Sequence, residues 1–506
     1  MNEGSTGMTG AGVGSTTERA TMRAADVLAV GMGTAVAMWA IKYLVAMPLV
    51  QAPAALTLAL LILTLFGGGV VLGRWSRRTW RGAVASGLVT SAVNLMALGA
   101  LLVDEGAPSP MFTVPGSAVF TVAVTLAGFA LGRRMMRRSG GPGNEPAWLS
   151  WLAIDTFAAT CLVVLAGGLV TGFDSGFAVP DWPTSFGANM FLYPLSKMDG
   201  GIYYEHAHRL AGTLVGLAAG TLMVRVWMER GLGRGAKALA TIVFVLVCLQ
   251  GLAGALWVVD VEPLEDGAAG TRQAGSLESA TGLSFDRPEP APSGEAEAGG
   301  AGYAPRQAAP TLGYILFHGT LGQIILALFA VIAAMVSPTW RDRRAGWDSE
   351  SASFDRMTSV GLGALIVVQL FLGVYLRKTD GMLLMHITVA GLVTLMVVAV
   401  GVRLWGVHGE RQATLKRLGL GLLWLVMAQL VLGFVALIVR RPVTGRTVEI
   451  GTTEVAPAVD ALVTTLHQSV GAAMLTLAAL AAAWTYRLLK PTNQPAPAPT
   501  IAASGG

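Results

Sequence analysis

Residues 205–212 read Glu205-His206-Ala207-His208-Arg209-Leu210-Ala211-Gly212, and they open an apolar run that is long enough to cross a bilayer. Three later apolar runs open in the same way, at His318, His386 and His467, and each of these histidines has a glycine about one turn further on. An imidazole in hydrocarbon is costly unless it has a partner, and a metal ion is a common one. Four histidines at matching places therefore predict two metal centres with two axial ligands each.

The composition predicts an integral membrane protein. Hydrophobic residues make up 53% of the 506 residues and charged residues 13%, with a mean hydropathy of +0.60. A soluble chain would carry about twice that share of charge. The predicted spans are residues 25–47, 54–73, 82–103, 112–132, 149–171, 204–226, 236–259, 311–337, 357–377, 381–404, 415–439 and 459–486. We therefore expect an all-α polytopic fold with about twelve transmembrane helices.

The distribution of positive charge predicts the topology. Arginine and lysine gather in the connections after the second, fourth, sixth, eighth and tenth spans, whereas the alternate connections are neutral or acidic. The positive-inside rule then places both termini in the cytoplasm, or in the matrix if the membrane belongs to an organelle. We expect the first of these, in the cytoplasmic (inner) membrane of a bacterium. Each of the four histidines lies within about two turns of the start of an even-numbered span. All four are therefore expected at one depth, near the outer face.

The domain organisation follows from a polar linker at residues 139–146. Residues 1–24 and 488–506 are expected to be a disordered N-terminus and a disordered tail. Residues 25–138 form an N-terminal four-helix membrane region, to which the sequence assigns no role. Residues 149–337 and 357–487 are predicted to be two pseudosymmetric four-helix bundles, the first with a disordered insertion at 260–310, which is rich in acids, Ala, Gly and Pro.

A second repeat supports the duplication. Three of the helices that precede the histidine helices carry Gln-x-x-x-Gly: Gln250 to Gly254, Gln369 to Gly373 and Gln429 to Gly433. The first hairpin has Leu165-Ala166-Gly167-Gly168 instead. Repetition at two levels indicates a helical hairpin duplicated twice, or a four-helix bundle duplicated once.

The four histidines have two readings. Any one of them could be a packing histidine that is hydrogen-bonded across the bundle, but four at one depth favour His208, His318, His386 and His467 as metal ligands. Zinc fits poorly because the bundles offer no thiolate ligands, whereas haem with two axial imidazoles fits an apolar bundle. His408 is predicted to be a surface residue of an inner loop. His206 lies about 200° around the helix from His208 and is expected to face elsewhere.

Charged residues distinguish the two halves. Glu205 precedes His208 by three residues and shares its helical face, which makes it a candidate proton acceptor, with Arg209 beside it. The alternative is an ordinary Glu205–Arg209 ion pair. In the second half, cations at the outer helix ends could pair with haem propionates or extend towards the headgroups. These cations are Arg377, Lys378, Arg440 and Arg441.

These residues carry a resemblance to a known family. Residues 168–183, GLVTGFDSGFAVPDWP, look like the outer-loop motif of the haem A synthase family, and Glu205-x-x-His208-Arg209 is similar to its signature. With His318, His386 and His467 in order, the resemblance covers about residues 149–490 and implies an eight-helix core. Bacterial relatives often have a cysteine pair in the first outer loop, where this chain has Val179 and Ser185. The four N-terminal helices and the 260–310 insertion are additional to that core.

The resemblance implies an oxidoreductase of haem A biosynthesis and cytochrome oxidase assembly. Such an enzyme oxidises the C8 methyl group of haem O to a formyl group through hydroxylated intermediates. His208 and His318 would flank the substrate haem O, with Glu205 and Arg209 catalytic. His386 and His467 would bind the iron of a haem b cofactor, with Arg377, Arg440 and Arg441 beside it.

The expected partners are haem O, a haem O synthase, an electron donor and a second copy of the chain, with no nucleic acid. Two alternatives stay open. One is a diheme b-type cytochrome that carries electrons without hydroxylating a substrate. The other is a haem-binding transporter or assembly protein.

Overall fold

The computed structural model describes residues 12–99, 109–141, 145–259, 261–263, 307–310, 312–342, 344–439, 448–449 and 457–492. Helices make up nearly all of the regular structure in these residues, which confirms the predicted all-α class. Eleven of the described helices are long and apolar enough to cross a membrane. The chain is therefore a multi-pass membrane protein.

The N-terminal helices form a closed ring. They are α1 (Gly12–Ala46), α2 (Ala54–Trp75), α3 (Trp80–Leu98) and α4 (Pro110–Arg138). Both α1 and α4 contact α2 and α3. The α2–α4 contact is close because glycines face backbone: a Cβ at Gly69 or Gly128 would overlap the carbonyl oxygen of Thr125 or Phe66.

One predicted span differs from the others. Helix α3 coincides with the predicted span 82–103 but is not among the eleven helices that qualify by length and hydropathy. Its buried polar residues lower its hydropathy, and two of them bind α1. Asn94 accepts a hydrogen bond from Trp39 Nε1 at 3.1 Å, and Thr90 donates to the carbonyl of Gly31 at 3.0 Å. Internal hydrogen bonds let such a helix lie within an apolar stack.

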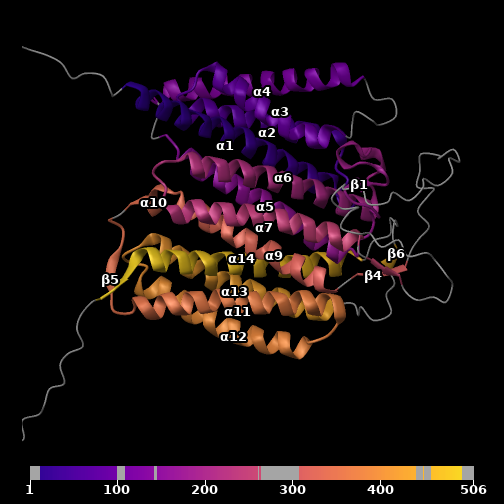
Figure 1. Cartoon of the computed structure of the whole chain (residues 1–506), viewed down its shortest axis with the longest axis vertical. Coiled ribbons are helices and arrows are strands. Elements are labelled where there is room, and N and C mark those ends of the chain that lie inside the picture. The colour runs from indigo at the N-terminus through magenta and orange to yellow at the C-terminus, as the bar shows by residue number, and fades with distance from the viewer. Residues whose placement is uncertain are drawn as a thin grey trace, which may run out of the picture.

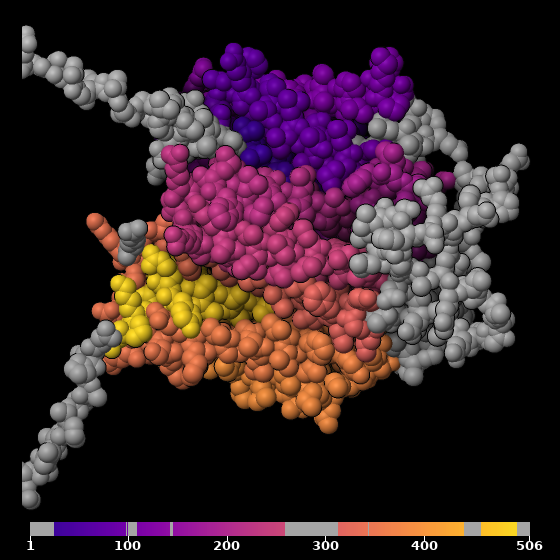
Figure 2. All heavy atoms as spheres, in the orientation of Figure 1, coloured from indigo at the N-terminus to yellow at the C-terminus, as the bar shows by residue number. Residues whose placement is uncertain are grey.

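The remaining long helices form two further rings. The first bundle consists of α5 (Trp148–Gly172), α6 (Gly200–Met228), α7 (Arg234–Val259) and α9 (Leu312–Met335). The second consists of α11 (Ala352–Thr379), α12 (Leu383–Val402), α13 (Ala413–Val439) and α14 (Ala458–Leu488). In each ring the consecutive helices contact one another and the last contacts the first. The three rings follow one another along the longest axis of the molecule (Figures 1 and 2).

The rings are not isolated from one another. Helix α1 packs on α5 and α6, and α14 packs on α5 and α9, whereas α7 packs extensively only on α6 and α9. One continuous apolar core joins residues of α1, such as Ala29 and Ala35, to Leu152 in α5 and Phe329 in α9. A second core, around Leu362, Val397 and Leu422, fills the second bundle. The first bundle therefore has protein on two of its sides.

Short elements close the ends of the stack. One end of the stack is predicted from the sequence to face outward and is called the outer end here, and the opposite end is called the inner end. At the outer end, where α5 joins α6, β1 (Thr184–Ser185) pairs antiparallel with β2 (Ala188–Asn189). At the same end β4 (Gln307–Pro310) lies between β3 (Val261–Pro263) and β6 (Val448–Glu449). At the inner end α10 (Pro338–Arg341) precedes β5 (Trp347–Ser349), which pairs with β7 (Leu489–Pro491). The outer connections thus link the two bundles.

The prediction that His408 is a surface residue is wrong. A π-helical turn at Arg403–Val407 continues α12 and brings His408 back against α11, where it is 3% exposed. Its Nε2 lies 2.9 Å from Asp355 Oδ2, and Arg403 Nε lies 2.6 Å from Asp355 Oδ1. The π-helical turn buries His408, and the sequence does not reveal this turn. It shows only the charged neighbours Glu410 and Arg411, which suggested a surface position.

Candidate functional site

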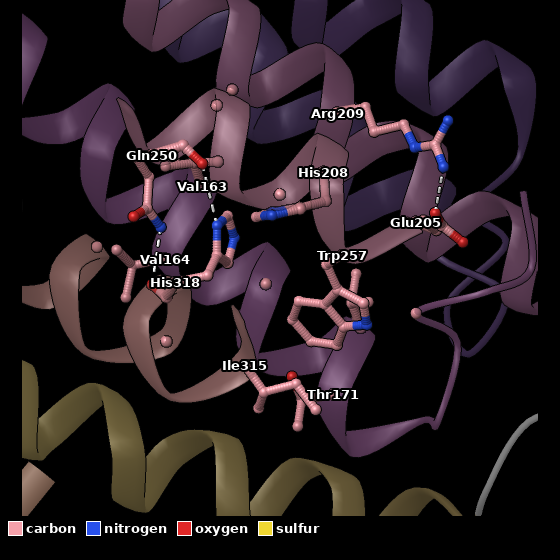
Figure 3. A pocket seen from close by; sticks show the side chains of 18 of the residues that line it. Val163, Val164, Thr171, Glu205, His208, Arg209, Gln250, Trp257, Ile315 and His318 are labelled. Carbon is pink, nitrogen blue, oxygen red and sulfur yellow. Dashed lines mark hydrogen bonds and ion pairs between the residues drawn. The ribbon is translucent and has the colours of Figure 1, made fainter. Parts of the chain in front are cut away.

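Two of the predicted ligands meet in the first bundle. His208 is on the third turn of α6, which begins at Gly200 with the Asp199 side chain as its cap, and His318 is on the second turn of α9. Their ring centroids are 6.2 Å apart and their planes are inclined at 80°. The two rings point towards one another inside the bundle (Figure 3).

The other two predicted ligands meet in the second bundle. His386 is on the first turn of α12 and His467 on the third turn of α14. Their centroids are 6.4 Å apart and their planes are inclined at 64°. The structure thus brings the four histidines together as the two pairs predicted from the sequence.

The spacing of both pairs fits a shared metal ion. Two imidazoles that each bind one ion at about 2 Å have ring centroids about 6 Å apart. No cluster of three or more His, Cys, Asp or Glu that could hold a metal occurs in the described residues. An ion between two imidazoles would therefore take its other ligands from a cofactor, and a porphyrin supplies four nitrogens in the plane between two axial groups.

Each histidine ring lies against a glycine of the preceding helix. A Cβ at Gly167, Gly254 or Gly433 would lie 2.8–2.9 Å from Cε1 of His208, His318 or His467, and one at Gly373 would lie 3.2 Å from Cε1 of His386. A side chain at these positions would displace the rings. Three of these glycines belong to the Gln-x-x-x-Gly repeat of the sequence, but the repeat alone does not reveal that they face the histidines.

The glutamines of that repeat contact the same histidines. Gln250 donates from Nε2 to the His318 carbonyl at 2.8 Å, and His318 Nδ1 lies 3.1 Å from the Gln250 carbonyl. Gln369 Nε2 lies 3.1 Å from the His386 carbonyl, and Gln429 Nε2 lies 3.3 Å from His467 Nε2. Of these contacts, the one between His318 Nδ1 and the Gln250 main-chain carbonyl is of the kind that fixes the orientation of a metal-binding imidazole.

A cavity of about 360 Å³ surrounds the first histidine pair. All four helices of the first bundle line it, and the outer loop between α5 and α6 adds Trp182 and Met190. Trp257 in α7 meets the His318 ring edge-on with centroids 5.9 Å apart. The volume and mainly apolar lining are typical of a small-molecule site.

Glu205 and Arg209 form the ion pair that was the alternative to a catalytic role. Arg209 Nη2 lies 2.5 Å from Glu205 Oε1, and the other carboxylate oxygen accepts the Val179 N–H at 2.8 Å. Arg209 also donates to the carbonyls of Val179 and Asp181. The pair therefore holds the outer loop, while both side chains also line the cavity (Figure 3).

His206 faces away from the bundle interior, as predicted. It is fully buried, and its Nδ1 lies 3.1 Å from Ser185 Oγ. Its ring packs against Tyr193, whose pKa is raised by burial and by the nearby Asp181 carboxylate. Ser185 and Val179, the residues in place of a cysteine pair, thus bind His206 and Glu205. They connect the loop to α6 without a covalent link.

Arg377 lies at the junction of the two bundles. Its guanidinium donates to Gln468 Oε1 at 2.6 Å, to Thr464 Oγ1 at 2.9 Å and to the Gly168 carbonyl at 3.1 Å. Arg377 and Lys378 line the first cavity rather than a second-bundle site, and Lys378 Nζ lies 5.7 Å from the Trp257 ring centroid. Arg440 and Arg441 lie outside the described residues.

Fold and site together define a multi-pass helical membrane protein with a histidine pair in each of two four-helix bundles. The model of the COX15-CtaA family, described as a cytochrome oxidase assembly protein, matches residues 150–269. The chain is 34% identical over 112 residues to a "Heme A synthase" of Geobacillus thermodenitrificans and 30% identical over 113 residues to one of Lysinibacillus sphaericus. The resemblance to the haem A synthase family is thereby confirmed over this segment.

The similarity covers part of each protein. The two alignments include 22% of this chain and 34% and 36% of the respective relatives, so the chain matches about a third of their length. The matched segment holds Glu205, His208 and the outer loop. No solved structure is significantly similar to the chain.

Proposed function

We propose that the chain is a haem A synthase, a membrane oxidoreductase that oxidises the C8 methyl group of haem O to the formyl group of haem A through hydroxylated intermediates. One observation carries the proposal. The two imidazole pairs have a spacing that suits a shared haem iron, and of the four histidines only His208 has a carboxylate, Glu205, three residues before it. The family match to residues 150–269 supports the same activity.

The two pairs have different roles in this proposal. His208 and His318 hold the substrate haem O in the first bundle, and His386 and His467 hold a haem b cofactor in the second. When bound, haem b supplies one-electron transfer. The apolar lining of the first cavity accommodates the hydrocarbon tail of haem O and keeps water away from the reacting carbon.

Glu205 is proposed as the proton acceptor. Glu205 is 4% exposed and its carboxylate pairs with Arg209, and as the ion it can take up a proton released when the methyl group is oxidised. Arg209 orients this carboxylate and holds the outer loop over the cavity. Arg377 and Lys378 place positive charge on the wall of the same cavity, where they suit the propionates of the bound haem.

The location and partners are part of the proposal. The arginine-rich connections favour an orientation in the bacterial cytoplasmic membrane with both termini in the cytoplasm and both histidine pairs near the outer face. Conversion of a methyl to a formyl group removes electrons and adds oxygen, so the reaction needs an oxidant such as dioxygen together with an electron donor. It also needs a source of haem O, for which a haem O synthase is the expected partner. Residues 25–138 receive no assignment.

The test is the identity of the bound haems. The full chain is purified from cells with and without a source of haem O, and the extracted haems are separated by chromatography and weighed by mass spectrometry. We expect haem b together with haem O, its hydroxymethyl derivative or haem A. Glu205→Gln should retain haem O and produce no haem A. Normal haem A production by this variant would remove Glu205 from catalysis.

The second candidate is a diheme b-type cytochrome, and it is favoured by the near-identical spacing of the two pairs. A cytochrome would yield haem b alone, at about two per chain, whether or not the cells make haem O. That result would overturn the synthase proposal and leave both histidine pairs as permanent haem sites.

A further inference from the structure

The first cavity has two chemically different ends. Its charged wall residues lie at the level of the histidine pair or nearer the outer end of the stack; they are Glu205, Arg209, Arg377 and Lys378. Glu205 precedes His208 by three residues, towards the outer start of α6. Arg209 donates to carbonyls of the outer loop, and Arg377 donates to the carbonyl of Gly168 near the outer end of α5. The anionic edge of a ligand would therefore lie at this end.

One residue from each helix of the first bundle lines the inner end of the cavity. Each lies seven positions inward of His208, His318 or a glycine that faces them: Val215 from His208, Ile325 from His318, Thr160 from Gly167 and Val247 from Gly254. Seven residues make about two helical turns, so the cavity extends about 10 Å inward of the histidine pair. Thr160 donates its hydroxyl to the Thr156 carbonyl at 2.8 Å, and the other three side chains are apolar. This end therefore suits a hydrocarbon group.

A buried amide lies between the histidine pair and the inner end. Gln323 lines the cavity five residues inward of His318 and is 1% exposed. Its Nε2 donates to the Gly319 carbonyl at 2.9 Å, whereas its Oε1 has no hydrogen-bond partner among the described residues. A buried acceptor without a partner costs free energy, which a ligand with a hydroxyl group would recover.

We propose that the inner end of this cavity is the subsite that distinguishes haem O from haem b. Gln323 Oε1 accepts a hydrogen bond from the hydroxyl of the hydroxyethylfarnesyl substituent, and the first carbons of the hydrocarbon tail lie against the four inner-end residues. This inference rests on the proposed function. The two haems differ only in this substituent, which is on the porphyrin edge opposite the two propionates. Propionates at the outer cations therefore direct it inward, and the C8 methyl, which neighbours a propionate, stays at the end that holds Glu205.

The hydroxyl and the tail contribute in different ways. The tail moves from lipid to a protein wall that is equally apolar, so its transfer changes the affinity little. The hydroxyl finds no acceptor in the hydrocarbon of the bilayer, and an amide oxygen that accepts its hydrogen bond is worth about 2–10-fold in affinity. The inner-end residues act by leaving room for the tail.

The test is a competition between two porphyrins. The full-length protein in detergent is incubated with equal amounts of haem O and iron protoporphyrin IX, and the bound haems are extracted and quantified. The wild type should hold haem O in the first site. Gln323→Leu should lower the ratio of bound haem O to iron protoporphyrin IX in the first site by about 2–10-fold. The total haem should stay the same, because iron protoporphyrin IX takes the place of haem O.

Filling the inner end tests the tail. Val215→Phe should lower the same ratio by about ten-fold or more, because the added ring overlaps the tail. Ile325→Phe on α9 gives the same test if Val215→Phe fails to fold. The control is Leu217→Phe on α6, where the side chain is 43% exposed on the outside of the bundle and the ratio should not change.

Two results would overturn the inference and leave the proposed function intact. A wild-type ratio in folded Gln323→Leu would remove the hydrogen bond, and a wild-type ratio in the folded phenylalanine variants would remove the tail from the inner end. If the wild type binds no haem O, or if His208→Ala leaves the bound haem O unchanged, the proposed function fails together with this inference.

Discussion

At the residue scale, the four glycine–histidine contacts determine where the rings can lie. The glycine is on one helix of a hairpin and the ring is on the other, so the ring position depends on two elements at once. Neither residue alone reveals this in the sequence. The histidines and the Glu205–Arg209 pair could be predicted because each depends on spacing along one helix. The direction of Arg377 could not, because contacts from α5 and α14 fix it.

The glycine contact gives the first prediction. Gly254→Ala should displace the His318 ring, because the added methyl would lie 2.9 Å from Cε1. We expect a cost of about 1–3 kcal/mol in haem binding, measured as the affinity of the first site for added haem. The control is Gly235→Ala on the same helix but away from the cavity, where a Cβ would meet only Met335 Cε at 3.9 Å. Equal affinities in the two variants would contradict the role of this contact.

Arg209 gives the second prediction. Arg209→Gln should leave Glu205 buried without its cation and release the carbonyls of Val179 and Asp181. Loss of one partner of a buried pair costs about 3–5 kcal/mol. Amide hydrogen exchange should therefore speed up over residues 178–187. Arg209→Lys keeps the positive charge without the forked geometry of the guanidinium, so its exchange rate over these residues should lie between those of the wild type and Arg209→Gln. Unchanged exchange in Arg209→Gln would mean that the loop is held by other contacts.

At the element scale, hydropathy predicted the helices well and the helix ends less well. Helix α11 was expected at residues 357–377 and runs over Ala352–Thr379, because its polar first turn is stabilised by the Ser351, Arg403 and His408 contacts to Asp355. The π-helical turn that buries His408 has no periodic pattern of apolar residues from which it could be predicted. Ring closure, such as the contact between α5 and α9, connects segments that are far apart in the chain and has no local signal.

The α2–α4 contact gives an element-scale prediction. Gly128→Ala should separate these helices, since its Cβ would overlap the Phe66 carbonyl, whereas Gly116→Ala on the same helix meets nothing within 4 Å. We expect thermal unfolding in detergent to begin at lower temperature for Gly128→Ala alone, with a cost of about 1–3 kcal/mol. Matching unfolding curves for the two variants would contradict the close packing.

At the scale of the whole molecule, the proposed orientation can be tested with thiol labelling. The natural Cys161 and Cys248 are first replaced by serine. Lys197→Cys then places a thiol in the outer loop, and Glu410→Cys places one in the connection between α12 and α13; both positions are exposed. A membrane-impermeant maleimide added to intact cells should label only the first. Labelling of Glu410→Cys instead would reverse the topology and place the histidine pairs near the cytoplasm.

The unequal packing around the first bundle affects how a hydrophobic ligand in the bilayer can reach it. Helix α1 closes the side formed by α5 and α6, and α14 closes the side formed by α5 and α9, whereas α7 presents Ile242, Val245 and Leu249 to the surroundings. A hydrophobic ligand that diffuses in the lipid would therefore contact the first bundle along α7. We therefore expect lateral entry from the lipid on this side, because the N-terminal ring and the second bundle cover the other two.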